Sequence, residues 1–178
     1  IIVGIIDKAG GVIHTEGYTF EEVKSLLEDR SSNFLEANNM MLFEEANEKI
    51  WSIGAEIFVP AAASRLLSQN QLDQMVENGL GVISAGANDF VDDKEIFFGP
   101  ISKSADERVS VLPDFIANCG MARVFAYLMK DEIEMTDKAI FADTSDCIKN
   151  ALIKSHAINN SKTHISKTAF EIALKELV

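Results

Sequence analysis

Hydrophobic positions along the chain fall into two patterns, short continuous runs and helical stripes. Short runs rich in β-branched residues and bounded by turn residues are typical of buried strands, whereas apolar positions three or four residues apart are typical of helices. The predicted strands are 1–6, 56–60, 81–86 and 109–113. The predicted helices are 19–29, 41–51, 71–79, 117–130, 136–155 and 164–177. Residues 30–40 are polar and asparagine-rich, which predicts a loop.

Helix ends are signalled at two places. Thr19 followed by Glu22 forms a capping-box pattern, which predicts a helix starting there. Gly79 stands at a C-cap-like position and predicts the end of the helix before it. Because strands alternate with helices up to about residue 116, we expect an α/β fold with a mainly parallel sheet, helices on both faces and a helical C-terminal tail.

Length and charge limit the class of protein. The 178 residues contain no linker-like segment, so we expect a single domain over 1–178, with an α/β part (1–116) and a helical part (117–178). The 28 acidic residues outnumber the 16 basic ones and give a net charge of −12, which disfavours binding to nucleic acids or anionic membranes. No apolar run approaches the ~20 residues that span a bilayer. The opening IIVGII predicts a strand, not a signal peptide.

Cysteine and histidine usage gives little sign of a structural or metal site. Cys119 and Cys147 are the only cysteines and form no CxxC motif, which favours a reducing, cytoplasmic location. The histidines lack the spacing of metal ligands, so no metal is expected. Cys119 at a helix start is a candidate reactive thiol, but we favour a small buried filler.

Three segments carry the functional signal: EIFVPAAAS (56–64), ISAGAND (83–89) and PDFIANCGMA (113–122). In order and spacing they resemble motifs of the glutamate/leucine/phenylalanine/valine dehydrogenases. Asp7 with GGVIHTEG (10–17) is similar to the second strand of that family's nucleotide domain and the turn after it. The resemblance covers nearly the whole chain. It implies a truncated NAD(P)-binding, Rossmann-like domain that lacks the first strand and the glycine-rich turn, since no GxGxxG occurs.

The resemblance also implies a cofactor site, because open parallel sheets bind ligands at the carboxyl ends of their strands. Small residues there allow close backbone approach, and asparagine offers both a donor and an acceptor to a ribose or carboxamide. The predicted cofactor-binding residues are Asp7, Pro60, Ala61, Ala62, Gly86, Ala87, Asn88 and Asn118. We expect them to cluster along one edge of the sheet.

Asp7 and Asn118 each have a structural alternative. Asp7 would accept hydrogen bonds from the adenosine ribose and repel a 2′-phosphate, which favours NAD over NADP, although Lys8 softens that preference and aspartate is also a common turn residue. Asn118 matches a residue that lines the family's cleft near nicotinamide and substrate, but asparagine is also a favoured helix N-cap.

The chain departs from the family pattern after Asn118. Cys119 stands where the family has alanine, and Met121 replaces a glycine. Phe125 occupies the position that faces the substrate side chain, where glutamate-specific members have serine. It cannot hydrogen-bond a carboxylate, so we expect an apolar amino acid as substrate. Arg123 could contact an acid, but we favour a solvated position for it. Two aspartate pairs could act as paired catalytic carboxylates, but we expect them to be solvated as well: Asp143 with Asp146, and Asp92 with Asp93.

The resemblance implies that the parent protein, expected to be a homo-oligomer, converts an L-amino acid to a 2-oxo acid and ammonia with hydride transfer to nicotinamide. The family's catalytic lysines and aspartate lie in a separate N-terminal domain that this chain does not match, so no catalytic residue is assigned. The alternative is a non-catalytic descendant that serves as a sensor or interaction module.

The absent first strand would lie between the runs 1–6 and 56–59 in a sheet of order 3-2-1-4-5-6. Unpaired backbone groups along that gap would cost roughly 1–3 kcal/mol each when buried. The gap must therefore close, be filled from another chain, or be filled by a first strand outside these residues. We favour closure or pairing with another chain, and dimerisation through the exposed edge is one form that such pairing could take. Because the phosphate-binding turn is absent, we expect this chain to bind NAD very weakly and to have no dehydrogenase activity.

Overall fold

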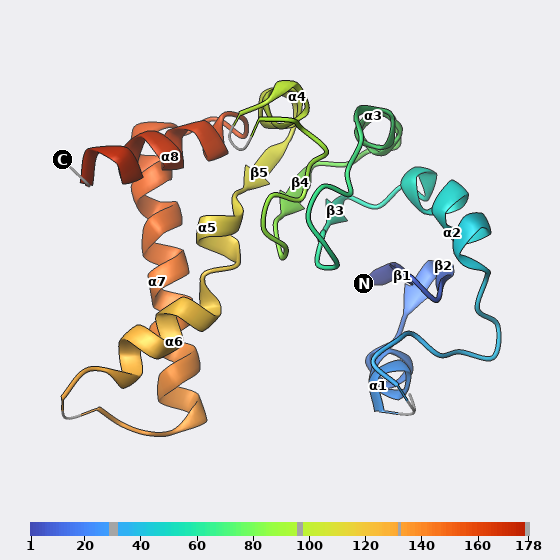
Figure 1. Ribbon diagram of the computed structural model, residues 1–178, viewed down its shortest axis with the longest axis horizontal. Helices are drawn as coiled ribbons and strands as arrows, with labels where there is room; N and C mark the ends of the chain where they lie inside the picture. Colours follow the sequence, from blue (N-terminus) through green and yellow to red (C-terminus); the bar gives the residue numbers. More distant parts are fainter. Residues whose placement is uncertain (29–31, 96–97, 132, 177–178) are drawn as a thin grey trace. The chain divides into compact units, whose positions relative to one another are not determined.

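The chain forms two compact units. The computed structural model describes residues 1–28, 32–95, 98–131 and 133–176. The first unit comprises Ile1–Glu56 and Asn70–Leu80, and the second comprises Ile57–Gln69 and Gly81–Val178. Figure 1 shows the elements of both units. The assignment of residues 1–178 to a single domain stays a prediction.

A β-hairpin is the centre of the first unit. Strand β1 (Ile2–Asp7) pairs antiparallel with β2 (Gly10–Tyr18), and Asp7 stands opposite Gly10 across the turn. The predicted first strand is confirmed. Residues 10–18, however, were expected to form a turn leading into a helix, and they form a second strand instead.

The glycines of β2 explain this difference. Gly11 exchanges two backbone hydrogen bonds with Met41, at 3.1 and 2.8 Å. A Cβ atom at Gly10 would lie only 2.3 Å from the Met41 carbonyl oxygen. The two glycines therefore permit a close approach of backbone inside a strand. A glycine pair in a sequence can indicate such an approach as well as a turn.

Three helices complete the first unit: α1 (Phe20–Glu28), α2 (Phe43–Lys49), which continues into the 3-10 helix η1 (Ile50–Ser52), and α3 (Gln69–Glu77). The capping box is confirmed, because the Thr19 N–H donates to Glu22 Oε2 at 2.7 Å and the Glu22 N–H donates to Thr19 Oγ1 at 3.3 Å.

The predicted end of α3 is also confirmed. Gly79 has a φ of +99°, in the region that favours glycine. The Leu80 N–H donates to the Met75 carbonyl at 2.9 Å and the Gly79 N–H donates to the Val76 carbonyl at 3.2 Å, the two bonds of a Schellman motif.

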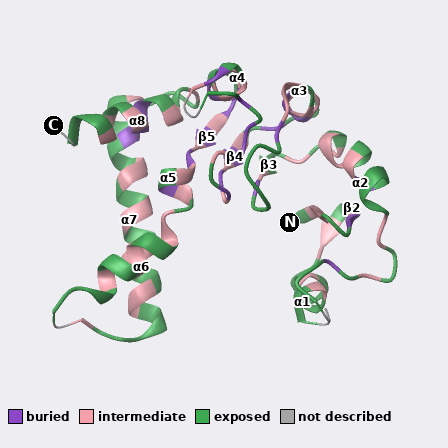
Figure 2. Cartoon of the chain, viewed as in Figure 1, coloured by how far each residue is buried: buried purple, intermediate pink, exposed green. Residues whose placement is uncertain are grey.

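The second unit contains a three-stranded parallel sheet of order β3-β4-β5. Its strands are β3 (Ile57–Phe58), β4 (Val82–Ser84) and β5 (Ser110–Leu112). The side chains of Ile83 and Val111 are buried at its centre, and Figure 2 shows buried residues gathered along β4 and β5. The parallel α/β arrangement predicted from the sequence is confirmed.

Helix α4 (Pro100–Arg108) connects β4 to β5, as a crossover between parallel strands requires. It was not predicted, because only Ala105 and Asp106 are buried and the helix has no apolar stripe. The expectation that Asp93 is solvated was wrong. Its carboxylate is buried and accepts hydrogen bonds from the Ile101 and Ser102 N–H groups in the first turn of α4.

The part of the second unit that follows β5 is mainly helical, as predicted. It consists of α5 (Asp114–Ala117), α6 (Gly120–Leu128), α7 (Asp137–Ile158) and α8 (Ile165–Glu176). The start of α8 is fixed by Asp106 of α4, which is buried and accepts hydrogen bonds from the Ser166 N–H at 2.9 Å and the Lys167 N–H at 3.0 Å.

Closure of the gap between residues 1–6 and 56–59 was one expectation for the sheet. Among the described strands, β1 pairs with β2 and β3 pairs with β4, so β1 and β3 belong to separate sheets. Direct pairing between them is therefore not observed. Pairing of an open strand edge with a second copy stays a prediction.

Candidate functional site

The ends of β3 and β4 come together through backbone and small side chains. The Gly86 N–H donates to the Pro60 carbonyl at 2.9 Å. A Cβ atom at Gly86 would lie 3.2 Å from both the Pro60 carbonyl oxygen and Ala61 Cβ, so a glycine suits this position. Ala62 is exposed and Ala87 is buried. Five predicted cofactor residues therefore share the carboxyl end of the sheet.

Asn88 and Asn118 meet at the same end of the sheet. Asn118 Nδ2 donates to Asn88 Oδ1 at 2.9 Å, and both residues are exposed. Whichever way the two amides are turned, this bond leaves one NH₂ group and one carbonyl oxygen without a partner among the described residues. The pair thus presents a donor and an acceptor to solvent, complementary to a primary carboxamide or to ribose hydroxyls.

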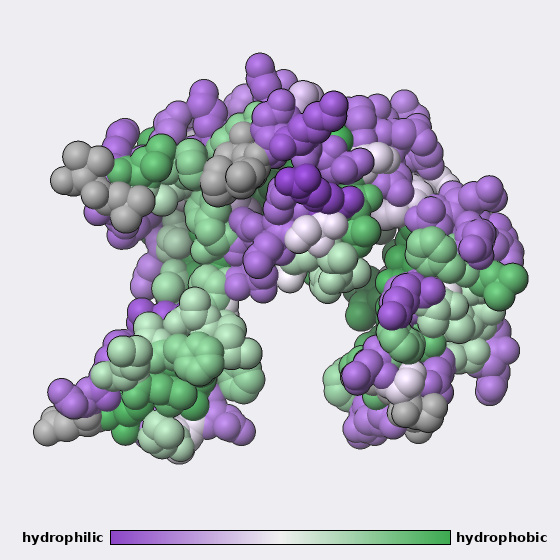
Figure 3. Space-filling view, in the orientation of Figure 1, coloured by the Kyte–Doolittle hydropathy of each residue, from purple (hydrophilic) through white to green (hydrophobic). Residues whose placement is uncertain are grey.

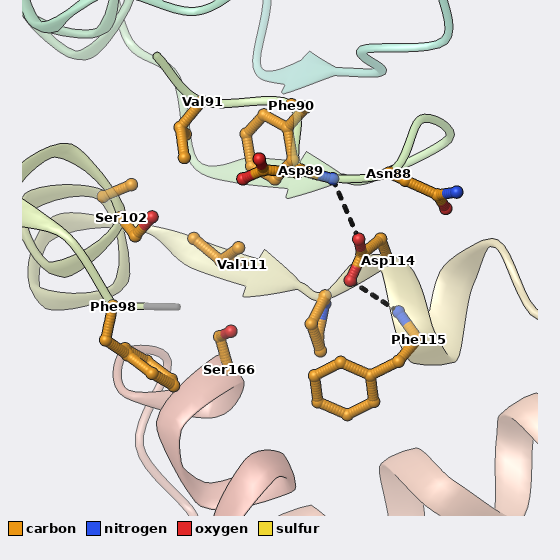
Figure 4. A pocket seen from close by; sticks show the side chains of 12 residues that line it. Asn88, Asp89, Phe90, Val91, Phe98, Ser102, Val111, Asp114, Phe115 and Ser166 are labelled. Atoms are coloured by element: carbon orange, nitrogen blue, oxygen red, sulfur yellow. Dashed lines mark hydrogen bonds between the residues drawn. The ribbon is translucent and has the colours of Figure 1, made fainter. Parts of the chain in front are cut away.

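Asp114 holds the two asparagine segments together, a role that sequence reasoning missed. Its Oδ2 atom accepts the Asp89 N–H at 3.0 Å, and its carbonyl accepts the Asn118 N–H at 2.7 Å. Figure 4 shows the Asp114 side chain between the Asn88 segment and Phe115, whose N–H donates to Oδ1 at 2.8 Å. The aspartate of PDF was the available signal, but its reach to another strand end cannot be read from spacing.

Asp7 belongs to the first unit, whereas the other predicted cofactor residues belong to the second. Its Oδ1 atom accepts the Ala9 N–H at 2.7 Å, and its Oδ2 atom accepts the Leu35 N–H at 2.5 Å. The turn-supporting role weighed for this residue is thus present. Each carboxylate oxygen can accept a further hydrogen bond, so its contact with a ribose stays a prediction. The neighbouring Lys8 lies over the Phe34 ring, 4.3 Å from its centroid.

Phe125 stands on an exposed apolar face of α6. Its side chain is 60% exposed, and that of Met121, one turn earlier, is 70% exposed. Figure 3 shows apolar surface gathered where α6 lies. A phenyl ring at this position provides no hydrogen bond for a substrate carboxylate.

Arg123 was expected to be solvated, and this was wrong. Its Nε and Nη2 atoms donate to the two carboxylate oxygens of Asp143 at 2.5 and 2.8 Å, and Lys130 Nζ lies 3.3 Å from the same carboxylate. The hydrogen bonds from Arg123 are the main cause that lowers the pKa of Asp143. This fork joins α6 to α7 and leaves neither residue free for a substrate.

A cavity of about 210 Å³ lies beside the asparagine pair. Its wall includes Asn88 and Asp114 together with the rings of Phe90, Phe98 and Phe115 (Figure 4). Ligand pockets commonly measure roughly 300–1,000 Å³, so this cavity is too small for a dinucleotide and fits a single ring or a small side chain. This cavity was not predicted from the sequence, because its aromatic rings come from two separate segments, the connection before α4 and the segment after β5.

Other kinds of site were also considered. Among the described residues, no group of three or more histidine, cysteine or acidic side chains is placed to hold a metal ion. No helix in the described part of the chain is both long and apolar enough to cross a membrane.

Comparison with known proteins gives a consistent result. A family model described as Glutamate/Leucine/Phenylalanine/Valine dehydrogenase matches residues 1–178. No curated protein matches the chain. The solved glutamate dehydrogenase of Plasmodium falciparum is 18% identical, with 94% of this chain and 37% of that chain covered and a TM-score of 0.65. Plasmodium falciparum glutamate dehydrogenase 2 is also 18% identical, with 94% of this chain and 38% of that chain covered and a TM-score of 0.69.

A mutant of glutamate dehydrogenase is similar at 16% identity, over 98% of this chain and 40% of that chain, with a TM-score of 0.68. At such identities the likeness establishes the fold, and it confirms the Rossmann-like α/β class. This chain spans between 37% and 40% of the length of these structures.

Proposed function

Because the chain belongs to the glutamate/leucine/phenylalanine/valine dehydrogenase family, we propose that its parent protein is an amino-acid dehydrogenase. It would oxidise an L-amino acid to a 2-oxo acid and ammonia with a nicotinamide cofactor. This chain would supply one side of the cofactor cleft. The chemistry that the cofactor supplies when bound is acceptance of the hydride.

The observation that carries the proposal is the hydrogen bond between Asn118 and Asn88. It joins the segment after β5 to the segment after β4, at the end of the sheet where open parallel sheets bind ligands. The exposed donor and acceptor of the pair would orient the nicotinamide carboxamide or its ribose. Small residues at the strand ends leave the neighbouring backbone accessible, so that a flat ligand can approach it closely. These residues are Pro60, Ala61 and Gly86.

The finer assignments are part of the same proposal. Asp7 would bind the adenosine ribose, and the parent would prefer NAD to NADP. Phe125 would face the substrate side chain and favour an apolar amino acid, in contrast to the glutamate dehydrogenases that share the fold. We also assign the parent to the cytoplasm and to a homo-oligomeric assembly.

The experiment uses the full-length parent protein and steady-state kinetics. Asn88→Ala and Asn118→Ala should each raise the KM for the nicotinamide cofactor by roughly five- to tenfold, because one hydrogen bond contributes about 1 kcal/mol. Asn150→Ala is the matched control, since Asn150 is an exposed asparagine of α7 far along the chain from the candidate site. Its kinetics should be unchanged.

Two outcomes would count against the proposal. An unchanged KM in both site variants would remove Asn88 and Asn118 from the cofactor cleft. A folded parent that turns over no amino acid with either cofactor would favour the non-catalytic sensor or interaction module. The departures from the family pattern at Cys119, Met121 and Phe125 are consistent with that alternative.

A further inference from the structure

Two cysteines that have no role in the proposed function meet between α6 and α7. Cys119 immediately precedes α6 and Cys147 lies in the middle of α7. Both are free and half-buried, and Cys147 lies close enough to raise the pKa of the Cys119 thiol. Reagents in solution can therefore reach a pair of thiols that lie near each other.

The register of the two helices explains why the cysteines meet. Arg123 lies one turn after Cys119, and its partner Asp143 lies one turn before Cys147. Residues four apart lie on the same face of a helix. Cys119 therefore lies one turn before Arg123, and Cys147 lies one turn after Asp143. In two antiparallel helices, these two positions face each other, next to the Arg123–Asp143 pair.

The first residue of α6 lies close to α7, as a disulfide between the two segments needs. A Cβ atom at Gly120 would lie 4.0 Å from Thr144 Cγ2, so the first residue of α6 stands directly against α7. Disulfides require Cα atoms roughly 4.4–6.8 Å apart.

We propose that Cys119 and Cys147 form a reversible intramolecular disulfide, and that this pair is a redox-sensitive modification site. The oxidant is a low-molecular-weight disulfide such as glutathione disulfide. One cysteine thiolate attacks a sulfur of the oxidant, which gives a mixed disulfide and releases one glutathione thiolate, which takes up the proton. The second cysteine then attacks the protein sulfur of the mixed disulfide and releases the second glutathione. Two protein thiols are oxidised and one oxidant disulfide is reduced.

The environment of the Cys119 thiol affects the rate of this thiol–disulfide exchange. Burial is the main cause that raises the pKa of the Cys119 thiol, and the neighbouring Cys147 raises it further, whereas Arg123 opposes the rise. The attacking species is the thiolate. Formation of the disulfide should therefore be slow at neutral pH and faster at alkaline pH.

The disulfide would act on the segment that carries Asn118, because Asn118 directly precedes Cys119. It would tie that segment covalently to α7. Whether this changes cofactor binding rests on the proposed function, but formation of the disulfide does not.

The test is to incubate the folded protein with glutathione disulfide at mildly alkaline pH, block the remaining thiols and map the tryptic peptides by mass spectrometry. The two cysteines lie in different peptides, 109–123 and 139–149. We expect the main product to be a monomer in which these two peptides are crosslinked, with a mass lower by two hydrogen atoms and restored by dithiothreitol. Stable mixed disulfides on both cysteines, or a disulfide-linked dimer, would overturn the proposal.

Variants test whether the crosslink depends on the placement of the two cysteines or only on the general reactivity of thiols. Cys119→Ser and Cys147→Ser should each lose the crosslink and retain glutathione on the remaining cysteine. Asp143→Ala should slow the formation of the crosslink, because it removes the ion pair that holds the register, whereas Asp146→Ala on the exposed side of α7 should not. Equal rates in the Asp143 and Asp146 variants would overturn the positioning role of the Arg123–Asp143 pair.

Discussion

Replacing Asp93 by alanine should destabilise the second unit through the first turn of α4. The N-cap of this helix is Gly99, which has no side chain to cap it. A Cβ atom at Gly99 would lie 2.4 Å from Asp93 Cγ, so the carboxylate occupies the space where a capping side chain would stand. Asp93 therefore caps α4 from several residues upstream.

The magnitude follows from the donors that Asp93 satisfies. Its carboxylate accepts the Ile101 N–H at 2.9 Å, the Ser102 N–H at 2.8 Å and the Ser102 hydroxyl at 2.7 Å, and the residue is only 4% exposed. Loss of a helix cap costs roughly 0.5–2 kcal/mol. The lost hydroxyl bond adds about 1 kcal/mol. We expect Asp93→Ala to lower the free energy of unfolding by about 1.5–3 kcal/mol.

Urea denaturation followed by circular dichroism measures this loss as a shift in midpoint at unchanged slope. Asp92→Ala is the matched control, because Asp92 is exposed and adjacent, and its effect should stay within about 0.5 kcal/mol. A double-mutant cycle with Ser102→Ala should give a coupling of about 1 kcal/mol. An Asp93→Ala effect no larger than that of Asp92→Ala would refute the capping argument.

Three further predictions concern the cofactor and the effect of pH. In the full-length parent, Asp7→Ser should narrow the preference for NAD over NADP in steady-state kinetics, and a wild-type preference for NADP would contradict the role given to Asp7. Calorimetric titration of this chain alone should show very weak NAD binding and no turnover, and micromolar binding would show that the missing phosphate-binding turn is not needed. Burial is the main cause that raises the pKa of Asp106 above its ordinary value of 3.8. A raised folded-state pKa gives stability that is present below the unfolded-state pKa and lost as the pH rises through the folded-state pKa. The stability of the wild type relative to Asp106→Asn, measured by urea denaturation, should therefore fall as the pH rises from 3.8, and a rise would contradict it.

The sequence predicted best where a local signal decides the structure. The capping box of Thr19 and Glu22 and the helix end at Gly79 depend on residues a few positions apart, and both were confirmed. The strands of the parallel sheet were found because they are short, apolar and bounded by turn residues. The meeting of Asn88 with Asn118 follows from parallel strands, whose carboxyl ends share one edge of a sheet.

The sequence failed where a distant partner decides. Strand β2 was missed because its glycines serve contact with Met41. Helix α4 was missed because only Ala105 and Asp106 are buried, so the helix has no apolar stripe. Asp93, Asp106 and Asp114 all resemble surface carboxylates in the sequence. Each instead accepts backbone N–H groups, from α4, from α8, and from the residue after Asn88 respectively. The partners of Asp106 are 60 and 61 residues away, beyond the range of any pattern of spacing.

The bond between Asp106 and the start of α8 also orders events during synthesis. A domain grows from its N-terminal end as the ribosome releases it. The β4–α4–β5 crossover can therefore form while α8 is still inside the ribosome, but the Asp106 carboxylate then lacks the N–H donors of Ser166 and Lys167. A carboxylate in that position is costly to bury. The nascent chain is therefore expected to keep the Asp106 carboxylate in water until α8 emerges and supplies its N–H donors.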